Sequence, residues 1–276
     1  MSEYQFDFHT HVPLRRIRET LAKAILRGLN AVAFTDYDST FTFDHLVKND
    51  FNGEPVLDTR GWKIQQLDDY LLRISKGEEF KIDVIRGEEV KSKEGDILAI
   101  GIRRPVAGGL SAQDTIERIY KQSGIVVFPH LAASYFGGCG EEVFRNVQGK
   151  FPGLPLALEV NAQYPEFFPW NNVARKLGIE HNLPVFAHSD IHGNYLKEHE
   201  KIGLKYHTSI HGIFSNDPIS DLKKAMLERP GSFREEGNAN NILETLAWNV
   251  HSFWKHCPSK SKSTLEGFLR GLKLTF

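Results

Sequence analysis

Two histidines stand at the end of the first apolar run of the chain, which reads Asp7-Phe8-His9-Thr10-His11. Because side chains alternate along a β-strand, His9 and His11 project to one side and can reach the same ion. An H-x-H pair also arises by chance in a chain with 12 histidines. The pair therefore indicates a metal site only where further ligands join it.

Further potential ligands stand at the ends of the later apolar runs. They are Asp36, Glu89, His130, Glu159, Asn161, His188, Asp190 and His192. The carboxyl ends of the strands of an α/β barrel form one face, on which active sites of barrel enzymes are built. Imidazole and carboxylate groups together suit zinc, manganese or iron. The sequence therefore predicts a metal centre at that face.

Strands and helices alternate in a pattern that could position these ligands. Apolar spacing predicts helices over residues 14–29 and 115–122, and Ser111 can cap the second of them. Short runs rich in Val, Ile and Phe predict strands over residues 4–9, 31–35, 82–87, 97–102, 125–129, 156–161, 184–188 and 206–213. The alternation indicates βαβ units and a parallel sheet.

The chain has 276 residues and no linker or repeat, so we expect a single domain over residues 1–276. Residues 39–61 are polar and turn-rich, which predicts a long loop over the mouth of the barrel, where substrates bind. Residues 218–276 predict a helical C-terminal extension packed on the barrel. Its apolar stripe would comprise Ile242, Leu246, Val250, Phe253 and Trp254.

The charge balance excludes some classes of partner. The chain carries 34 Lys and Arg against 35 Asp and Glu, so a broad basic surface for nucleic acid is not indicated. No stretch approaches the length of a membrane span, and we expect a cytoplasmic protein. Cys139 and Cys257 are far apart in sequence, which argues against a thiolate metal site. The oligomeric state is left open.

Taken in order, the motifs resemble those of the polymerase and histidinol phosphatase (PHP) superfamily. The matching set is D-F-H-T-H, F-T-D-Y-D, G-E-E-V, F-P-H, L-E-V-N and S-D-I-H, spread over residues 7–192. The resemblance implies a distorted (β/α)7 TIM-like barrel of the PHP type, here with extra C-terminal helices. It also implies two or three divalent metals at the barrel mouth and, most commonly, phosphoesterase activity.

The resemblance assigns metal ligands, which are His9, His11, Glu89 and Asp190 for one ion, Glu89 and His130 for a second, and His192 for a third. The chain departs from the family at the third position. Tyr37 stands where the family usually has a His, and Pro13-Leu14-Arg15 replaces a polar motif. A phenol with a pKa of about 10 is a poor ligand. We therefore expect the third position to be weak, vacant or filled by other groups.

Other residues are predicted to assist. His192, His188 and Tyr37 are candidates to protonate the leaving group. Arg15 and Asn161 are candidates to bind substrate, and Glu159 to support the ligands. Asp7 and Asp36 are expected to accept hydrogen bonds from the ligand imidazoles. Asp96 stands where many relatives have a His, and could bind metal or cap a turn.

The expected function is hydrolysis of a phosphomonoester or phosphodiester, of a small-molecule substrate, by a metal-activated hydroxide. One alternative is a carboxylester or amide hydrolase on the same metal centre. Another is a catalytically lapsed PHP module with structural metal. An amidohydrolase-type barrel ranks below these, because the fourth predicted strand ends in Arg103-Arg104 rather than in a lysine that could bridge metals.

Overall fold

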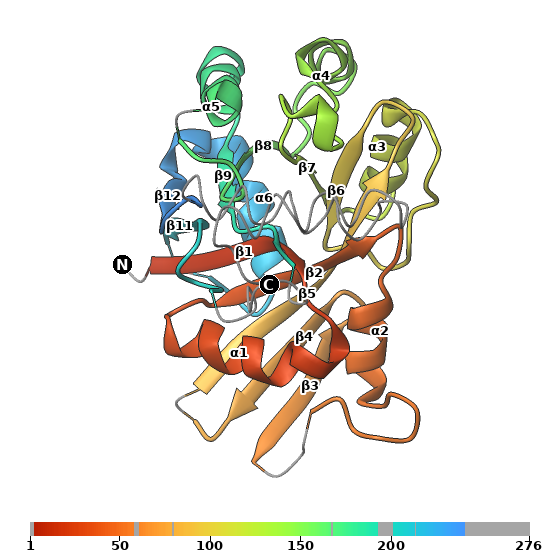
Figure 1. Cartoon of the computed structure of the whole chain (residues 1–276), viewed down its shortest axis with the longest axis vertical. Coiled ribbons are helices and arrows are strands. Elements are labelled where there is room, and N and C mark those ends of the chain that lie inside the picture. Colours follow the sequence, from red (N-terminus) through yellow and green to blue (C-terminus); the bar gives the residue numbers. More distant parts are fainter. Residues whose placement is uncertain are drawn as a thin grey trace, which may run out of the picture.

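The computed structural model describes residues 3–57, 61–78, 80–166, 168–192, 201–212 and 214–240. Within them the chain has an α/β fold whose strands form one mixed sheet that curls into a nearly closed barrel (Figure 1). The sheet order is β12-β11-β1-β2-β5-β6-β7-β8-β9, with β10 beside β1 and the β3–β4 hairpin beside β5. The two ends of this order approach each other. Ala187 of β9, the last strand, donates its backbone N–H at 2.8 Å to the Thr208 side chain of β11, the second strand.

The strands lie close to where the sequence predicts them. Their bounds are β1 (Glu3–His11), β2 (Ala31–Tyr37), β3 (Trp62–Asp68), β4 (Leu71–Lys76), β5 (Phe80–Lys91), β6 (Asp96–Ile100), β7 (Ile125–Phe128), β8 (Leu156–Asn161), β9 (Val185–His188), β10 (Ile191–His192), β11 (His207–His211) and β12 (Arg234–Glu236). All eight predicted strands are present. The short or polar strands β3, β4, β10 and β12 were not predicted.

The prediction of a purely parallel sheet is wrong. Strands β1, β2 and β5 are parallel, as are β7, β8 and β9, but β6 runs antiparallel to both of its neighbours. The reason is the connection after β5, where Ser92 donates its N–H to the carbonyl of Gly95 at 3.0 Å. This turn is far too short for the helical crossover that a parallel pair requires.

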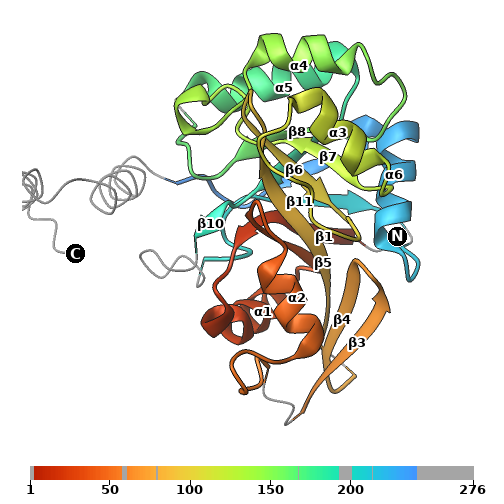
Figure 2. The ribbon, with the colours of Figure 1, turned by 90° about the vertical axis from the view of Figure 1, so that its right-hand side faces the viewer.

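Six helices of the described chain pack around the sheet. They are α1 (Ile17–Leu26), α2 (Phe41–Lys48), α3 (Ala112–Tyr120), α4 (Glu141–Gln148), α5 (Pro169–His181) and α6 (Pro218–Glu228). In Figures 1 and 2, α1, α2 and the β3–β4 hairpin lie together in one half of the molecule and α3, α4 and α5 in the other. The predicted cap is confirmed, because Ser111 accepts the N–H of Asp114 at 3.1 Å.

The interior of the barrel is filled by one face of its strands. Phe6, Phe8 and Phe186 are fully buried there, and Ile219 and Leu222 of α6 join the same cluster. Full burial of each such side chain contributes roughly 1.5–3 kcal/mol to folding. The cluster gives the barrel a solid floor beneath the carboxyl ends of the strands.

Two predicted regions differ from expectation. Residues 39–61 are not simply a loop, because α2 forms within them and buries Phe43 and Leu46 against the barrel wall. Of the predicted C-terminal extension, α6 and β12 are seen, whereas the apolar stripe from Ile242 onward lies outside the described residues. None of the helices that the structure describes is long and apolar enough to cross a membrane.

Candidate metal centre

The end of β1 carries the two histidines that the sequence singles out. His9 is fully buried, and the ring centroids of His9 and His11 lie 5.1 Å apart. Strand β10 pairs with this end of β1 in parallel, with Thr10 opposite Ile191 and His11 opposite His192. The pairing brings Asp190, just before β10, to the same place.

Four ligand atoms converge at the ends of β1 and β5 and just before β10. They belong to His9, His11, Glu89 and Asp190, which we call the ligand quartet. The Nε2 atoms of the two histidines are 3.2 Å apart. Glu89 Oε2 lies 3.3 Å from Nε2 of His9 and 3.0 Å from Nε2 of His11. Asp190 Oδ1 lies 3.3 Å and 3.4 Å from the same two nitrogens.

These separations suit a cation better than hydrogen bonds. A tetrahedral ion with bonds of about 2.1 Å holds its ligand atoms about 3.4 Å apart. Glu89 Oε2 and Asp190 Oδ1 are buried, yet neither accepts a hydrogen bond of acceptable geometry within the described chain. Buried acceptors are rarely left so. The residues present therefore fit a divalent transition metal, as the resemblance implies.

Glu89 also reaches a second group of ligands. Its other oxygen, Oε1, lies 3.1 Å from Nε2 of His130. His9, Glu89 and His130 form a second buried set able to hold an ion, and Nδ1 of His130 has no hydrogen-bond partner within the described chain. One carboxylate thus faces both sets, which is the arrangement expected of a bridging ligand.

Glu159 holds the ligands in orientation. Its Oε1 accepts the Nδ1–H groups of His9 at 2.8 Å and of His188 at 2.9 Å. Its Oε2 accepts the backbone N–H of His130 at 2.8 Å and the side-chain amide of Asn161 at 2.9 Å. A carboxylate on Nδ1 leaves the Nε2 lone pair of His9 directed toward the metal position.

The expected roles of Asp7 and Asp36 are wrong. Asp7 accepts hydrogen bonds from the backbone and hydroxyl of Ser189. Asp36 accepts from the backbone and hydroxyl of Thr42, at the start of α2. Both carboxylates brace segments around the centre rather than its imidazoles.

Charges in the centre depend on one another. Burial by itself would lower the pKa of His11, but Asp190 and Glu89 raise it to about 9. Burial would raise the pKa of Glu89, but His9, His11 and His130 lower it well below its usual range. The metal-free centre therefore carries protonated imidazoles against ionised carboxylates, and a bound ion would displace those protons.

Two ligand residues adopt unusual backbone conformations. His130 has a φ of 32° and Asp190 a φ of 49°, values that non-glycine residues seldom adopt. Such conformations cost on the order of 1–3 kcal/mol and cluster at functional sites. The strain here directs both side chains toward the quartet.

Tyr37 and His192 are in contact at the position where the resemblance implies a third ion. The Tyr37 hydroxyl lies 3.3 Å from Nε2 of His192, and its ring stacks on His11 with centroids 4.5 Å apart. His192 Nδ1 lies 3.0 Å from the backbone oxygen of Asp190. Among the described residues, His192 joins neither of the two sets able to hold an ion.

Two further predicted residues, His188 and Asn161, lie beside the quartet rather than in it. His188 is buried against Phe6, Phe8 and Phe186, in the floor of the barrel. Asn161 is also fully buried, and its amide donates to Glu159 and to Asp190, the latter at 3.1 Å. This placement suits orientation of ligands more than substrate contact.

Arg15 lies apart from these residues, in the exposed turn that follows β1 (Leu14–Arg16). The neighbouring Arg16 forms a salt bridge with Glu19 at 2.8 Å, so this part of the turn is tied to α1. Arg15 is not one of the quartet residues, and its expected role in substrate binding stays a prediction.

A cavity of about 530 Å³ adjoins the centre, which we call the mouth cavity. Its lining is Tyr37, Lys91 to Asp96, Ser134 and Phe136 to Gly138. Asp96 is buried, and burial together with the charge of Glu89 raises its pKa to about 7. The lysines of this cavity were missed in the sequence, where nothing linked them to the ligands.

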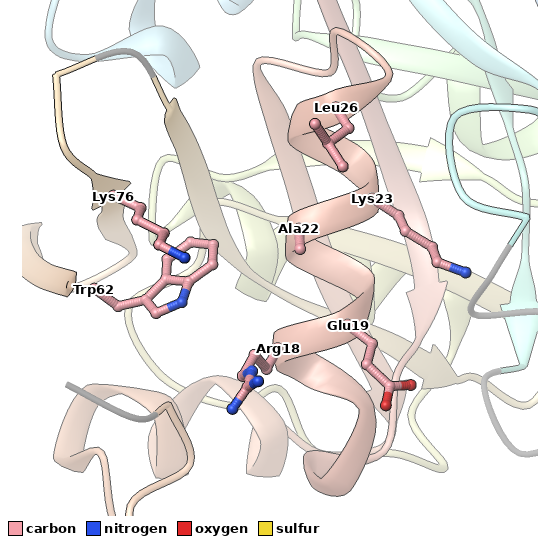
Figure 3. A pocket seen from close by; sticks show the side chains of 7 residues that line it. All are labelled: Arg18, Glu19, Ala22, Lys23, Leu26, Trp62 and Lys76. Carbon is pink, nitrogen blue, oxygen red and sulfur yellow. The ribbon is translucent and has the colours of Figure 1, made fainter. Parts of the chain in front are cut away.

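A separate hollow of about 440 Å³ lies between α1 and the β3–β4 hairpin (Figure 3). It is lined by Trp62, Leu26, Lys76 and charged residues of α1, and the Lys76 ammonium lies 5.7 Å from the centre of the Trp62 ring. It shares no residue with the metal centre.

Comparisons with known sequences give one partial match. No protein-family model matches the chain. An uncharacterised protein of Methanocaldococcus jannaschii, MJ1587, is 32% identical over 66 residues, which span 24% of this chain and only 39% of that protein.

Solved structures align over nearly the whole chain. PsfC from Pseudomonas syringae superposes with a TM-score of 0.62 at 15% identity, covering 91% of this chain and 98% of its own. Endonuclease Q, solved with a 27-mer duplex substrate that has an abasic lesion at the active site, superposes with a TM-score of 0.54 at 12% identity, covering 93% of this chain and 68% of its own. The chain therefore shares its fold, a nearly closed mixed barrel, with these two structures.

Proposed function

We propose that this chain is a metal-dependent phosphoesterase that hydrolyses a phosphomonoester or phosphodiester. The observation that carries the proposal is the ligand quartet, whose residues come from three separate motifs. Its two imidazole nitrogens lie 3.0–3.4 Å from each other and from both carboxylate oxygens. Glu89 and His130 support a second ion beside it.

The residues would hold two ions of zinc, manganese or iron. When bound, such ions lower the pKa of water and withdraw charge from phosphoryl oxygens. The chain supplies the rest: Glu159 fixes the imidazole of His9, and the buried floor of Phe6 and Phe8 keeps water from reaching the centre from below. A third ion is not part of the proposal, because the Nε2 atom of His192 already faces Tyr37.

Protonation of the leaving group falls to Tyr37. In the metal-free protein, burial and then the positive charge of His11 lower the pKa of His192 to about 4. Bound cations would act in the same direction, so its imidazole is neutral near pH 7. Since Nδ1 of His192 donates to the Asp190 carbonyl, Nε2 can accept from the Tyr37 hydroxyl in the free protein. The same O–H would turn from His192 to the leaving-group oxygen when substrate is bound. Burial raises the pKa of Tyr37, so the phenol keeps its proton at all ordinary pH values.

Phosphate suits the surroundings better than a carboxylic ester does. Lys91 and Lys93 line the mouth cavity, and cationic groups stabilise the charge of a phosphate substrate. A neutral carboxylic ester would gain little from them. The likeness to Endonuclease Q, an endonuclease solved with a 27-mer duplex substrate, also supports a phosphodiester or related ester.

Metal-restored turnover tests the proposal. The protein is stripped with a chelator, reloaded with manganese, zinc or iron(II), and assayed with p-nitrophenyl phosphate, bis-p-nitrophenyl phosphate and p-nitrophenyl acetate. We expect hydrolysis of a phosphoester that is lost on stripping and regained on loading. His11→Ala should abolish it, whereas His211→Ala, at an exposed histidine of β11, should not. Fully loaded protein that hydrolyses only the acetate, or nothing, would contradict the proposal.

A further inference from the structure

The mouth cavity lies next to the metal centre. Tyr37 lines the cavity and also stacks on the metal ligand His11. Asp96 lines it as well, and the charges of Glu89 and His130 act on the pKa of Asp96. A substrate with its scissile phosphate at the ions could therefore extend directly into this space.

The cavity wall is formed by two backbone segments that pack directly against each other. The segment before Asp96 packs against the segment around Gly137, and the Asp96 N–H donates to the Gly137 carbonyl at 2.7 Å. Gly137 has a φ of 95°, and a Cβ there would overlap Oδ2 of Asp96. A Cβ on Gly138 would overlap the backbone oxygen of His130. Only glycine allows this close approach, which links the wall to a metal ligand.

Two lysines line the cavity beside this wall. The Lys91 Nζ lies 4.5 Å from the centre of the Tyr37 ring, so one aromatic ring separates it from His11. The backbone of Lys93 is fixed, because its N–H donates to the Leu110 carbonyl at 2.8 Å. Among the residues that the structure describes, neither ammonium forms an ion pair.

Two of the acids around the lysines are engaged by backbone groups, and a third, Asp96, lines the cavity and interacts electrostatically with Lys91. Glu94 accepts the N–H of Ala112, at the start of α3, at 2.6 Å. Asp38 accepts the N–H of Lys91 at 2.8 Å. These bonds hold the carboxylates without neutralising the ammonium groups. The cavity therefore offers two cations that metal binding does not require.

We propose that the mouth cavity binds a second phosphate, on the leaving-group side of the substrate, through Lys91 and Lys93. The inference rests on the proposed function and narrows it to phosphoesters that carry another phosphate a few bonds from the scissile one. A single phosphate would be held by the ions alone. Lysine binds phosphate as a mobile point charge, which tolerates more than one leaving-group shape.

A matched set of substrates tests the proposal. Butane-1,4-diol monophosphate, butane-1,4-diol bisphosphate and 4-phosphonooxybutanoate share one carbon chain and differ in the far group. We expect kcat/KM for the bisphosphate to exceed that for the monophosphate at least tenfold, about 1.4 kcal/mol, mainly through KM. The carboxylate substrate should fall between them. A carboxylate that matches or exceeds the bisphosphate would overturn the assignment to phosphate.

Substitution of the lysines provides the second arm. The double variant Lys91→Ala/Lys93→Ala should lower the bisphosphate-to-monophosphate ratio to near one. Because the ratio compares two substrates on the same protein, partial misfolding does not change it. The matched control is Lys23→Ala/Lys76→Ala, which removes two lysines of the separate hollow in Figure 3 and should leave the ratio unchanged.

A binding measurement separates this inference from the proposed function. Butane-1,4-bisphosphonate and butylphosphonate, which cannot be hydrolysed, are titrated calorimetrically into metal-loaded protein. Tighter binding of the bisphosphonate that depends on both lysines supports the second-phosphate site even if no ester is turned over. Turnover of the monophosphate without preference for the bisphosphate overturns the site and leaves the phosphoesterase standing. Neither turnover nor a difference in binding overturns both.

Discussion

Replacing Glu159 by Gln should weaken metal binding without touching a metal ligand. Each oxygen of Glu159 accepts two hydrogen bonds: Oε1 from the Nδ1 atoms of His9 and His188, and Oε2 from the His130 backbone and the Asn161 amide. Gln offers one oxygen and one NH2 group of nearly the same shape. In either orientation the NH2 group must face two N–H donors.

The size of the effect follows from this count. If the NH2 group faces His130 and Asn161, two buried donors lose their acceptor, at about 1–3 kcal/mol each. If it faces His9 and His188, their protons must move to Nε2 to avoid the clash, and Nε2 of His9 then cannot bind metal. Loss of such an orienting carboxylate typically costs 10–100-fold in metal affinity.

Competition titration with a fluorescent chelator measures the affinity, and urea unfolding of metal-free protein measures the stability. We expect Glu159→Gln to lose about 2–6 kcal/mol of stability and at least tenfold in affinity. Glu88→Gln is the matched control, since Glu88 is equally buried and one residue from Glu89, but on the opposite face of β5. Burial raises its pKa to about 7, so an uncharged side chain is tolerated there. Wild-type metal affinity in Glu159→Gln would refute the reasoning.

Three further outcomes are expected. Tyr37→Phe should lower kcat at least tenfold, since it removes the donor to the leaving group, while metal content by plasma mass spectrometry stays the same; unchanged kcat would exclude the phenol as proton donor. His130→Ala should bind one ion instead of two, and two retained ions would show that His130 is no ligand. The pKa of His11 is raised to about 9 in the metal-free protein, so its stabilising contribution is complete below about pH 6.5 and is lost as the pH rises through 9. Urea midpoints of metal-free protein should therefore fall over that range, by more than those of His11→Gln, and equal slopes would contradict it.

The metal ligands were predictable because the relevant signal is local. A period of two along one strand places His9 and His11 on one side, and each further ligand stands at the end of its own apolar run. The order of these motifs along the chain then predicts the barrel fold. The structure brings together the quartet and His130 in the same way, since parallel strands such as β1, β2 and β5 end at one edge.

What could not be predicted depends on contacts between distant strands. Glu159 was expected to support the ligands, but which ligand it contacts was not predictable. Only the structure shows that it reaches His9 across 150 positions of sequence and that Asp7 does not support this imidazole. The β3–β4 hairpin was missed because β3 is polar along most of its length, with only half-buried and exposed side chains. The strand β6 was predicted, but its antiparallel direction was not, because apolar content does not reveal strand direction.

Anomalous diffraction from crystals of the reloaded protein tests the central claim most directly, because it locates each ion and its ligands without an assumed substrate. We predict two peaks, one within the quartet of His9, His11, Glu89 and Asp190 and one between Glu89 and His130. Protein shown by mass spectrometry to retain metal, but with no peak at the quartet, would contradict the account.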